Sequence, residues 1–98
     1  MQFLIQARDH TDPEALSRRL AVREDHIKTI DELKARGHMH MGAALVDDDG
    51  KMIGSVIICE FNDRAELDAW LAVEPYVTGK VWEKIEVSLC KVGPSFVK

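Results

Sequence analysis

Cysteine and long apolar runs are both scarce in this chain, and each shortage excludes a class of protein. The only two cysteines, Cys59 and Cys90, are thirty-one positions apart with no Cys-x-x-Cys, so a redox or zinc-pair motif is disfavoured. The longest apolar stretches, residues 39–46 and 55–59, are far too short to span a bilayer. The first residues are typical of a strand and not of a signal peptide. We therefore expect a cytoplasmic protein with free, packed thiols.

Clustered positive charge is also lacking. Thirteen Lys and Arg against seventeen Asp and Glu give a net charge of −4, and the cations are scattered among acids. Nucleic acids and anionic membranes are bound by gathered cations that neutralise phosphates, so we expect neither partner. The absence of repeats, charge blocks and Pro- or Ser-rich tracts argues against disorder. The 98 residues, 46% of them hydrophobic, fit a single domain over residues 1–98.

What the chain does contain is an alternation of strand and helix signals. Apolar runs and β-branched residues predict strands at residues 1–7, 37–44, 52–61 and 83–92. The Asp-Gly pair at residues 49–50 predicts a tight turn between the second and third strands. With one helix after the first strand and another after the third, the order predicts a ferredoxin-like βαββαβ fold of the α+β class. In this fold two helices cover one face of a four-stranded antiparallel sheet.

The two helices are predicted from the signals at their ends. The first has Asp12 as a plausible cap with Pro13 at the first helical position, and Gly37 can take the left-handed conformation that a helix end needs. The second begins at the capping residue Asp63 and ends before Pro75, after which a connector leads to the last strand. The apolar residues of the first helix fall on one side of the helical wheel. They are Leu16, Leu20, Val22, Ile27, Ile30 and Leu33.

The other face of the sheet requires a cover of its own. The first and third strands carry apolar side chains on both faces, and a chain of 98 residues is too short to cover both. A second copy that brings its own sheet is the simplest cover, and two-fold dimers are the commonest oligomers. We therefore predict a homodimer.

His26 is the strongest candidate for chemistry. It falls inside the apolar stripe of the first helix, where a leucine would pack better, and its N–H then needs a partner. Asp9, at the end of the first strand, could accept that bond and leave the other ring nitrogen as a base. Their contact requires the helix to start some distance beyond the strand end or to bend near residues 21–22, and we expect such a break. Glu74 is the reserve partner. The alternative is a core histidine satisfied by a structural carboxylate.

Further side chains could complete a site around His26. Arg23, one turn earlier, could clamp an anionic substrate group, although a structural ion pair with Glu74 or Asp9 is slightly preferred. Ser55 and Tyr76 could offer hydroxyls to a ligand, or could simply pack.

His38 and His40 share one strand face but lack a third ligand, so we expect no metal. The two tryptophans, Trp70 and Trp82, are expected to be packing anchors.

The order of these motifs resembles that of the YciI-like (YCII-related) family. RRLAVREDHIKTIDELKARGHMHMGAAL, residues 18–45, is similar to the family's basic-leucine segment, its Arg-x-x-His, and its Gly-ended second strand. GKMIGSVIICEFNDRAELDAWLAVEPYV, residues 50–77, is similar to its Gly-Ser strand, second helix and Asp-Pro-Tyr step. The chain departs from the pattern at Ala43, where the family usually has proline, and at Glu74, where it has aspartate.

The resemblance implies a dimeric α+β barrel and a suspected His–Asp active site, here His26 with Asp9. Similar barrels include muconolactone isomerases and cofactor-independent monooxygenases. We therefore expect a small enzyme without cofactors that moves a proton on a small cyclic or carbonyl-bearing substrate, as in isomerisation or elimination. Arg23, Ser55 and Tyr76, together with Glu74, would bind the substrate. The alternative is a non-catalytic module in which the same pocket binds a small ligand or serves assembly.

Overall fold

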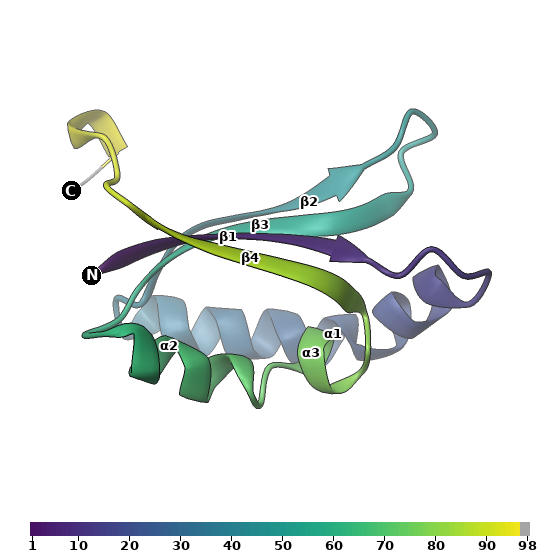
Figure 1. Ribbon diagram of the computed structural model, residues 1–98, viewed down its shortest axis with the longest axis horizontal. Coiled ribbons are helices and arrows are strands. Elements are labelled where there is room, and N and C mark those ends of the chain that lie inside the picture. Colours follow the sequence, from purple (N-terminus) through teal and green to yellow (C-terminus); the bar gives the residue numbers. More distant parts are fainter. Residues whose placement is uncertain (97–98) are drawn as a thin grey trace.

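Four strands and three α-helices make up the computed structural model, which describes residues 1–96. The strands form one antiparallel sheet in the order β2-β3-β1-β4, and all three helices lie below one face of it (Figure 1). This arrangement confirms the predicted ferredoxin-like α+β fold. The elements are β1 (Gln2–Asp9), α1 (Ala15–Ala35), β2 (Met39–Val46), β3 (Met52–Glu60), α2 (Arg64–Leu71), α3 (Pro75–Thr78), β4 (Trp82–Cys90) and the short 3-10 helix η1 (Pro94–Phe96).

The central strand β1 shows how the sheet divides its side chains between two faces. Phe3, Ile5 and Ala7 are buried against the helices, whereas Gln6 and Arg8 on the other face are exposed. This alternation follows from the two-residue period of a strand. The apolar core therefore lies between the sheet and the helices. Its buried members are Phe3, Ile5, Ala7, Met39, Ile57, Cys59, Phe61, Leu67, Trp70, Tyr76, Val81 and Trp82.

The cysteines are free, as the sequence predicts. Cys59 is buried in the core and Cys90 is half-buried near the end of β4. Burial raises the pKa of the Cys59 thiol to about 12, so this cysteine remains a thiol at neutral pH and is poorly reactive. None of the helices that the structure describes in residues 1–96 is long and apolar enough to cross a membrane.

The ends of the helices differ in part from the prediction. Gly37 ends the first helix in the left-handed conformation, with φ of +82°, as predicted. The predicted start is wrong, because Asp12 accepts hydrogen bonds from the Glu14 amide and the Arg18 guanidinium and α1 begins only at Ala15. The predicted separate first piece before residues 21–22 is wrong, because α1 is one continuous helix. Its first turns do tilt toward the sheet in Figure 1, as the predicted bend requires.

The segment after α2 is more ordered than the predicted connector. Asp63 caps α2 by accepting a hydrogen bond from the Glu66 amide at 2.8 Å, as the capping-box pattern predicts. Pro75, expected only to end that helix, instead begins the short helix α3. A proline suits the first helical position because its missing N–H would have no partner there. Glu74 precedes Pro75 as the cap of α3, and this places its carboxylate beside α1.

Candidate active site

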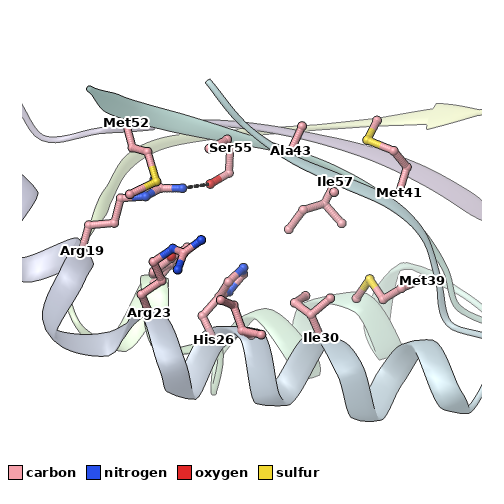
Figure 2. Close-up of a pocket in the computed structure, with 14 residues that line it drawn as sticks. Arg19, Arg23, His26, Ile30, Met39, Met41, Ala43, Met52, Ser55 and Ile57 are labelled. Carbon is pink, nitrogen blue, oxygen red and sulfur yellow. Dashed lines mark hydrogen bonds between the residues drawn. The ribbon is translucent and has the colours of Figure 1, made fainter. Parts of the chain in front are cut away.

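A cavity of about 220 Å³ lies between α1 and the β2–β3 half of the sheet. Figure 2 shows Arg23 and His26 rising into it from the helix, with Ser55 and Ile57 facing them from β3. The cavity has a polar end beside Arg19 and an apolar end formed by isoleucine and methionine side chains. Its lining consists of Arg19, Arg23, His26, Ile27, Ile30, Met39, Met41, Gly42, Ala43, Ala44, Met52, Ser55, Ile57 and Tyr76.

His26 is paired with Glu74 in this cavity. The Nδ1 atom of His26 is hydrogen bonded to Oε1 of Glu74, a side chain with no exposed surface. The other carboxylate oxygen, Oε2, accepts a hydrogen bond from the Tyr76 amide at 2.5 Å, so the cap of α3 fixes the carboxylate. An ionised carboxylate only accepts hydrogen bonds, so Glu74 in that form selects the tautomer of His26 with the proton on Nδ1 and leaves Nε2 as the nitrogen that can act as a base.

The pairing of His26 with Asp9 that the sequence predicts is therefore wrong, and the reserve partner takes its place. Asp9 is occupied by Arg19, whose Nη1 atom donates to both carboxylate oxygens at 2.9 and 3.0 Å. Both side chains are buried. Burial raises the pKa of Asp9 above its usual value, and the hydrogen bond and charge of Arg19 oppose that rise. A buried guanidinium holds Asp9 in place, and none of the hydrogen bonds within residues 1–96 joins Asp9 to His26.

Arg19 extends this network into the cavity. Its Nη2 atom donates a hydrogen bond to the Ser55 hydroxyl oxygen at 2.9 Å (Figure 2). The indole Nε1 of Trp82 donates to the same oxygen at 3.2 Å. Trp82 therefore does more than pack, because it fixes a hydroxyl at the cavity wall. Asp9, Arg19, Ser55 and Trp82 form one connected chain of hydrogen bonds from the end of β1 to the cavity.

Tyr76 forms the floor between the two polar pairs. Its ring stacks on the imidazole of His26 with the centroids 3.9 Å apart, and the Arg19 guanidinium lies 4.6 Å from its centroid. The stacking on Tyr76 and the hydrogen bond to Glu74 orient the His26 ring, and the cation–π contact holds Arg19 against the tyrosine. The pKa of the Tyr76 hydroxyl is raised, chiefly by burial, so the phenol stays protonated. Tyr76 thus contributes its aromatic face to the arrangement of the site.

Arg23 does not form the structural ion pair that the sequence analysis slightly preferred. It is exposed, it lines the cavity, and none of the ion pairs within residues 1–96 includes it. The slight preference for a buried ion pair with Glu74 or Asp9 is therefore wrong. With Asp9 paired to Arg19 and Glu74 paired to His26, Arg23 brings a positive charge to the cavity that no neighbouring carboxylate cancels.

Arg19 is the site residue that the sequence prediction missed. It precedes His26 by seven positions, which is two turns of a helix, so both belong to one face. The predicted stripe instead included Leu20, which is 54% exposed, whereas Arg19 is 2% exposed. A charged residue seven positions before the key histidine was an available signal. Its hydrophobic neighbour obscured that signal.

His38, which precedes β2, and His40, which lies in β2, are not among the residues that line the cavity. His38 Nδ1 is hydrogen bonded to the Glu60 carbonyl oxygen at 2.7 Å, and His40 Nε2 is 2.7 Å from the Glu60 carboxylate. Within residues 1–96 no group of three or more His, Cys, Asp or Glu side chains is placed to hold a metal ion. The carboxylate of Glu60 has its pKa lowered, first by its hydrogen bond to His40 and then by that to Gln2.

Comparisons with known proteins agree with this architecture. The family model of the YCII-related domain matches residues 1–91. The protein YciI of Escherichia coli O6:H1 is 32% identical over 93 residues, which cover 89% of this chain and 93% of that protein. An uncharacterized protein of Haemophilus influenzae is 30% identical over the same shares of the two chains.

Two solved structures extend the comparison. The 5-chloro-2-hydroxyhydroquinone dehydrochlorinase of Burkholderia phenoliruptrix AC1100, solved with 2,5-dihydroxybenzoquinone, is 25% identical with a TM-score of 0.82, and the match covers 97% of this chain and 98% of that one. A dimeric ferredoxin-like protein of unknown function from Jannaschia sp. CCS1 is 17% identical with a TM-score of 0.53, over 93% of this chain and 98% of that one. The second likeness concerns the fold alone.

Proposed function

The chain belongs to the YCII-related domain family, and from that membership we propose that it is a small cofactor-independent enzyme that transfers a proton on a small cyclic or carbonyl-bearing substrate. The proposal depends mainly on one observation, the pairing of His26 with the buried carboxylate of Glu74 inside a cavity. Nε2 of His26 is the base, and Glu74 fixes the tautomer and stabilises the positive charge that follows proton uptake. The acid of the proposed pair is therefore Glu74 and not Asp9.

The size and lining of the cavity support a small ring as substrate. A cavity of about 150 Å³ suffices for benzene, and this one is about 220 Å³ with one apolar end. Ile57 and Ile30 face each other across it in Figure 2, where the faces of a flat ring would lie. Arg23, Ser55 and Tyr76 line its polar end, where they would bind the oxygen substituents of such a ring.

The related dehydrochlorinase supplies a first substrate to test. Purified protein and 5-chloro-2-hydroxyhydroquinone would be mixed without oxygen, and released chloride would be measured against a protein-free control. An enzyme should release many equivalents of chloride per protein chain. If the protein is a non-catalytic module, the ligand should raise the melting temperature increasingly with its concentration, without releasing chloride beyond the control. This second outcome would contradict the proposed elimination.

The outer face of the sheet supports the proposal that the protein works as a homodimer. Side chains directly opposite each other on neighbouring strands share a face, and the pairs Leu4–Ile58 and Gln6–Val56 lie on the face away from the helices. Leu4, Val56 and Ile58 are only half-buried in the single chain. A second copy of the chain, related by a two-fold axis, would bring its own sheet against this face and bury them.

The homodimer predicts a definite sedimentation behaviour. The wild-type protein should sediment as a dimer across a wide dilution range, and Ile58→Lys should shift it to the monomer, because a charge would be buried between the sheets. Leu89→Lys is the matched control. Leu89 is 66% exposed and, opposite Phe3, lies on the helix side of the sheet. A wild-type monomer of normal solubility at every concentration would contradict the proposal.

A further inference from the structure

The Ser55 hydroxyl can form only one further hydrogen bond, as a donor. Its oxygen accepts a hydrogen bond from Arg19 Nη2 and a second from Trp82 Nε1. A serine hydroxyl has two acceptor lone pairs and a single O–H donor. With both lone pairs facing fixed N–H groups, the O–H group can only donate, and it can do so in only one remaining tetrahedral direction.

The two groups that donate to Ser55 are rigidly held. Arg19 is anchored by both oxygens of Asp9 and packs on the ring of Tyr76. Trp82 is 5% exposed, and its ring packs edge-on against the same tyrosine. Neither donor can withdraw without leaving a buried polar group unpaired, which is costly. The Ser55 hydroxyl is therefore fixed as a donor before any ligand arrives.

This donor faces the proposed catalytic base across the cavity. In Figure 2 the Ser55 hydroxyl hangs from β3 toward the space above Arg23 and His26. Within residues 1–96 no side chain or carbonyl accepts its proton. Arg23 faces Ser55 from α1 at the same end of the cavity in Figure 2, and it brings the positive charge that no ion pair cancels. A group that fits here must present an oxygen that accepts a hydrogen bond and carries negative charge.

We infer that the pocket is built for a substrate whose carbonyl or hydroxyl oxygen becomes an oxyanion, and that Ser55 donates the hydrogen bond that stabilises it while Arg23 supplies the opposite charge. The inference rests on the proposed function and names the substrate class. His26 Nε2 takes a proton from the substrate, and the electron pair of the broken bond moves onto the substrate oxygen. That oxygen is then bound by the Ser55 O–H group, and the proton on His26 is later returned. Ser55 is not a nucleophile, because nothing near it takes its proton.

The inference predicts a selective loss of anion binding in Ser55→Ala. Calorimetry would measure the binding of two probes. The first is 2,5-dihydroxybenzoquinone, an acidic compound that is anionic at neutral pH, and the second is hydroquinone, which is neutral. A hydrogen bond to a charged group contributes about 1.5–3 kcal/mol, so the dissociation constant for the anion should rise about 10- to 100-fold. The dissociation constant for hydroquinone should rise less, about two- to tenfold, since hydrogen bonds between neutral groups are weaker. Ser17→Ala, an exposed serine on α1 away from the cavity, should change neither value.

A second variant tests the fixed direction of the hydroxyl and does not depend on Ser55→Ala folding well. Trp82 does not line the cavity, yet Trp82→Phe frees one lone pair of Ser55 and lets the hydroxyl rotate and accept. The ratio of anion to hydroquinone affinity should therefore fall in Trp82→Phe as it does in Ser55→Ala. Equal losses of both probes, unchanged anion binding in Ser55→Ala, or no anion binding by the wild type would each overturn the inference. Anion binding that needs Ser55 without any turnover would contradict the proposed function instead.

Discussion

Replacing Asp9 with asparagine should lower the free energy of unfolding by about 3–5 kcal/mol, because Arg19 would keep its charge without a counter-ion in the protein interior. The Arg19 side chain is 3% exposed and that of Asp9 is 4% exposed, so water cannot replace the lost carboxylate. In a domain of this size each kcal/mol corresponds to about 4–8 °C in the melting temperature. Thermal and urea unfolding monitored by circular dichroism would measure the loss.

Asp12→Asn provides a matched control for this prediction. Asp12 and Arg18 form the same kind of pair, with hydrogen bonds of 2.6 and 2.9 Å, but on the surface. Solvent screens such a pair and hydrates either partner when the other is removed, so this variant should melt close to the wild type. Equal small effects of Asp9→Asn and Asp12→Asn would show that the interior of the site is wetter than the structure indicates.

The raised pKa of Asp9 adds a further expectation about the pair. Burial raises this pKa, and the hydrogen bond and charge of Arg19 lower it, so much of what the ion pair contributes is offset by the cost of burying its two charges. Substituting both partners, as in Asp9→Leu with Arg19→Met, should therefore recover much of the stability lost in Asp9→Asn. What would not recover is the hydrogen bond to Ser55.

Local signals in the sequence were sufficient to predict the order of the elements, and the errors arose where ion pairs between side chains competed with those signals. Strand alternation, the Asp63 cap and Gly37 each depend on a few neighbouring residues, and all three are confirmed. Asp12 looked like a cap, but Arg18 took its side chain and moved the start of α1. A helical wheel treats α1 as straight, and this favoured Leu20 over its buried neighbour.

The composition of the site was predictable in part for the same reason. His26, Ser55, Tyr76 and Glu74 do meet at one cavity or at its edge, as the sequence pattern suggested. The partner of His26 was not decidable from sequence, because Asp9 and Glu74 are both carboxylates that the fold brings toward α1. Only the three-dimensional position of Arg19 shows that Asp9 is already occupied. Glu74 was left as the free acceptor by this competition.

Glu74→Gln should abolish most catalysis while leaving the protein folded. The glutamine side chain has one acceptor oxygen and one NH₂ donor in place of two acceptors. The Tyr76 amide can only donate, so it takes the oxygen and keeps α3 capped. The NH₂ group then faces Nδ1 of His26, which has to accept. The imidazole proton consequently moves to Nε2, and the base of the proposed mechanism is lost.

This change of tautomer is measurable with and without a substrate. The turnover number of Glu74→Gln should fall about 10²- to 10⁴-fold, the usual contribution of a positioned acid–base group. The turnover number of His26→Gln should fall by the same factor. In ¹⁵N NMR spectra of labelled histidine, the protonated nitrogen of His26 should switch from Nδ1 to Nε2 in Glu74→Gln. Glu60→Gln alters the surface pair with His40 and should change neither readout. If Glu74→Gln kept the proton on Nδ1 and its turnover within threefold of the wild type, His26 would not depend on Glu74, and the pair would be structural.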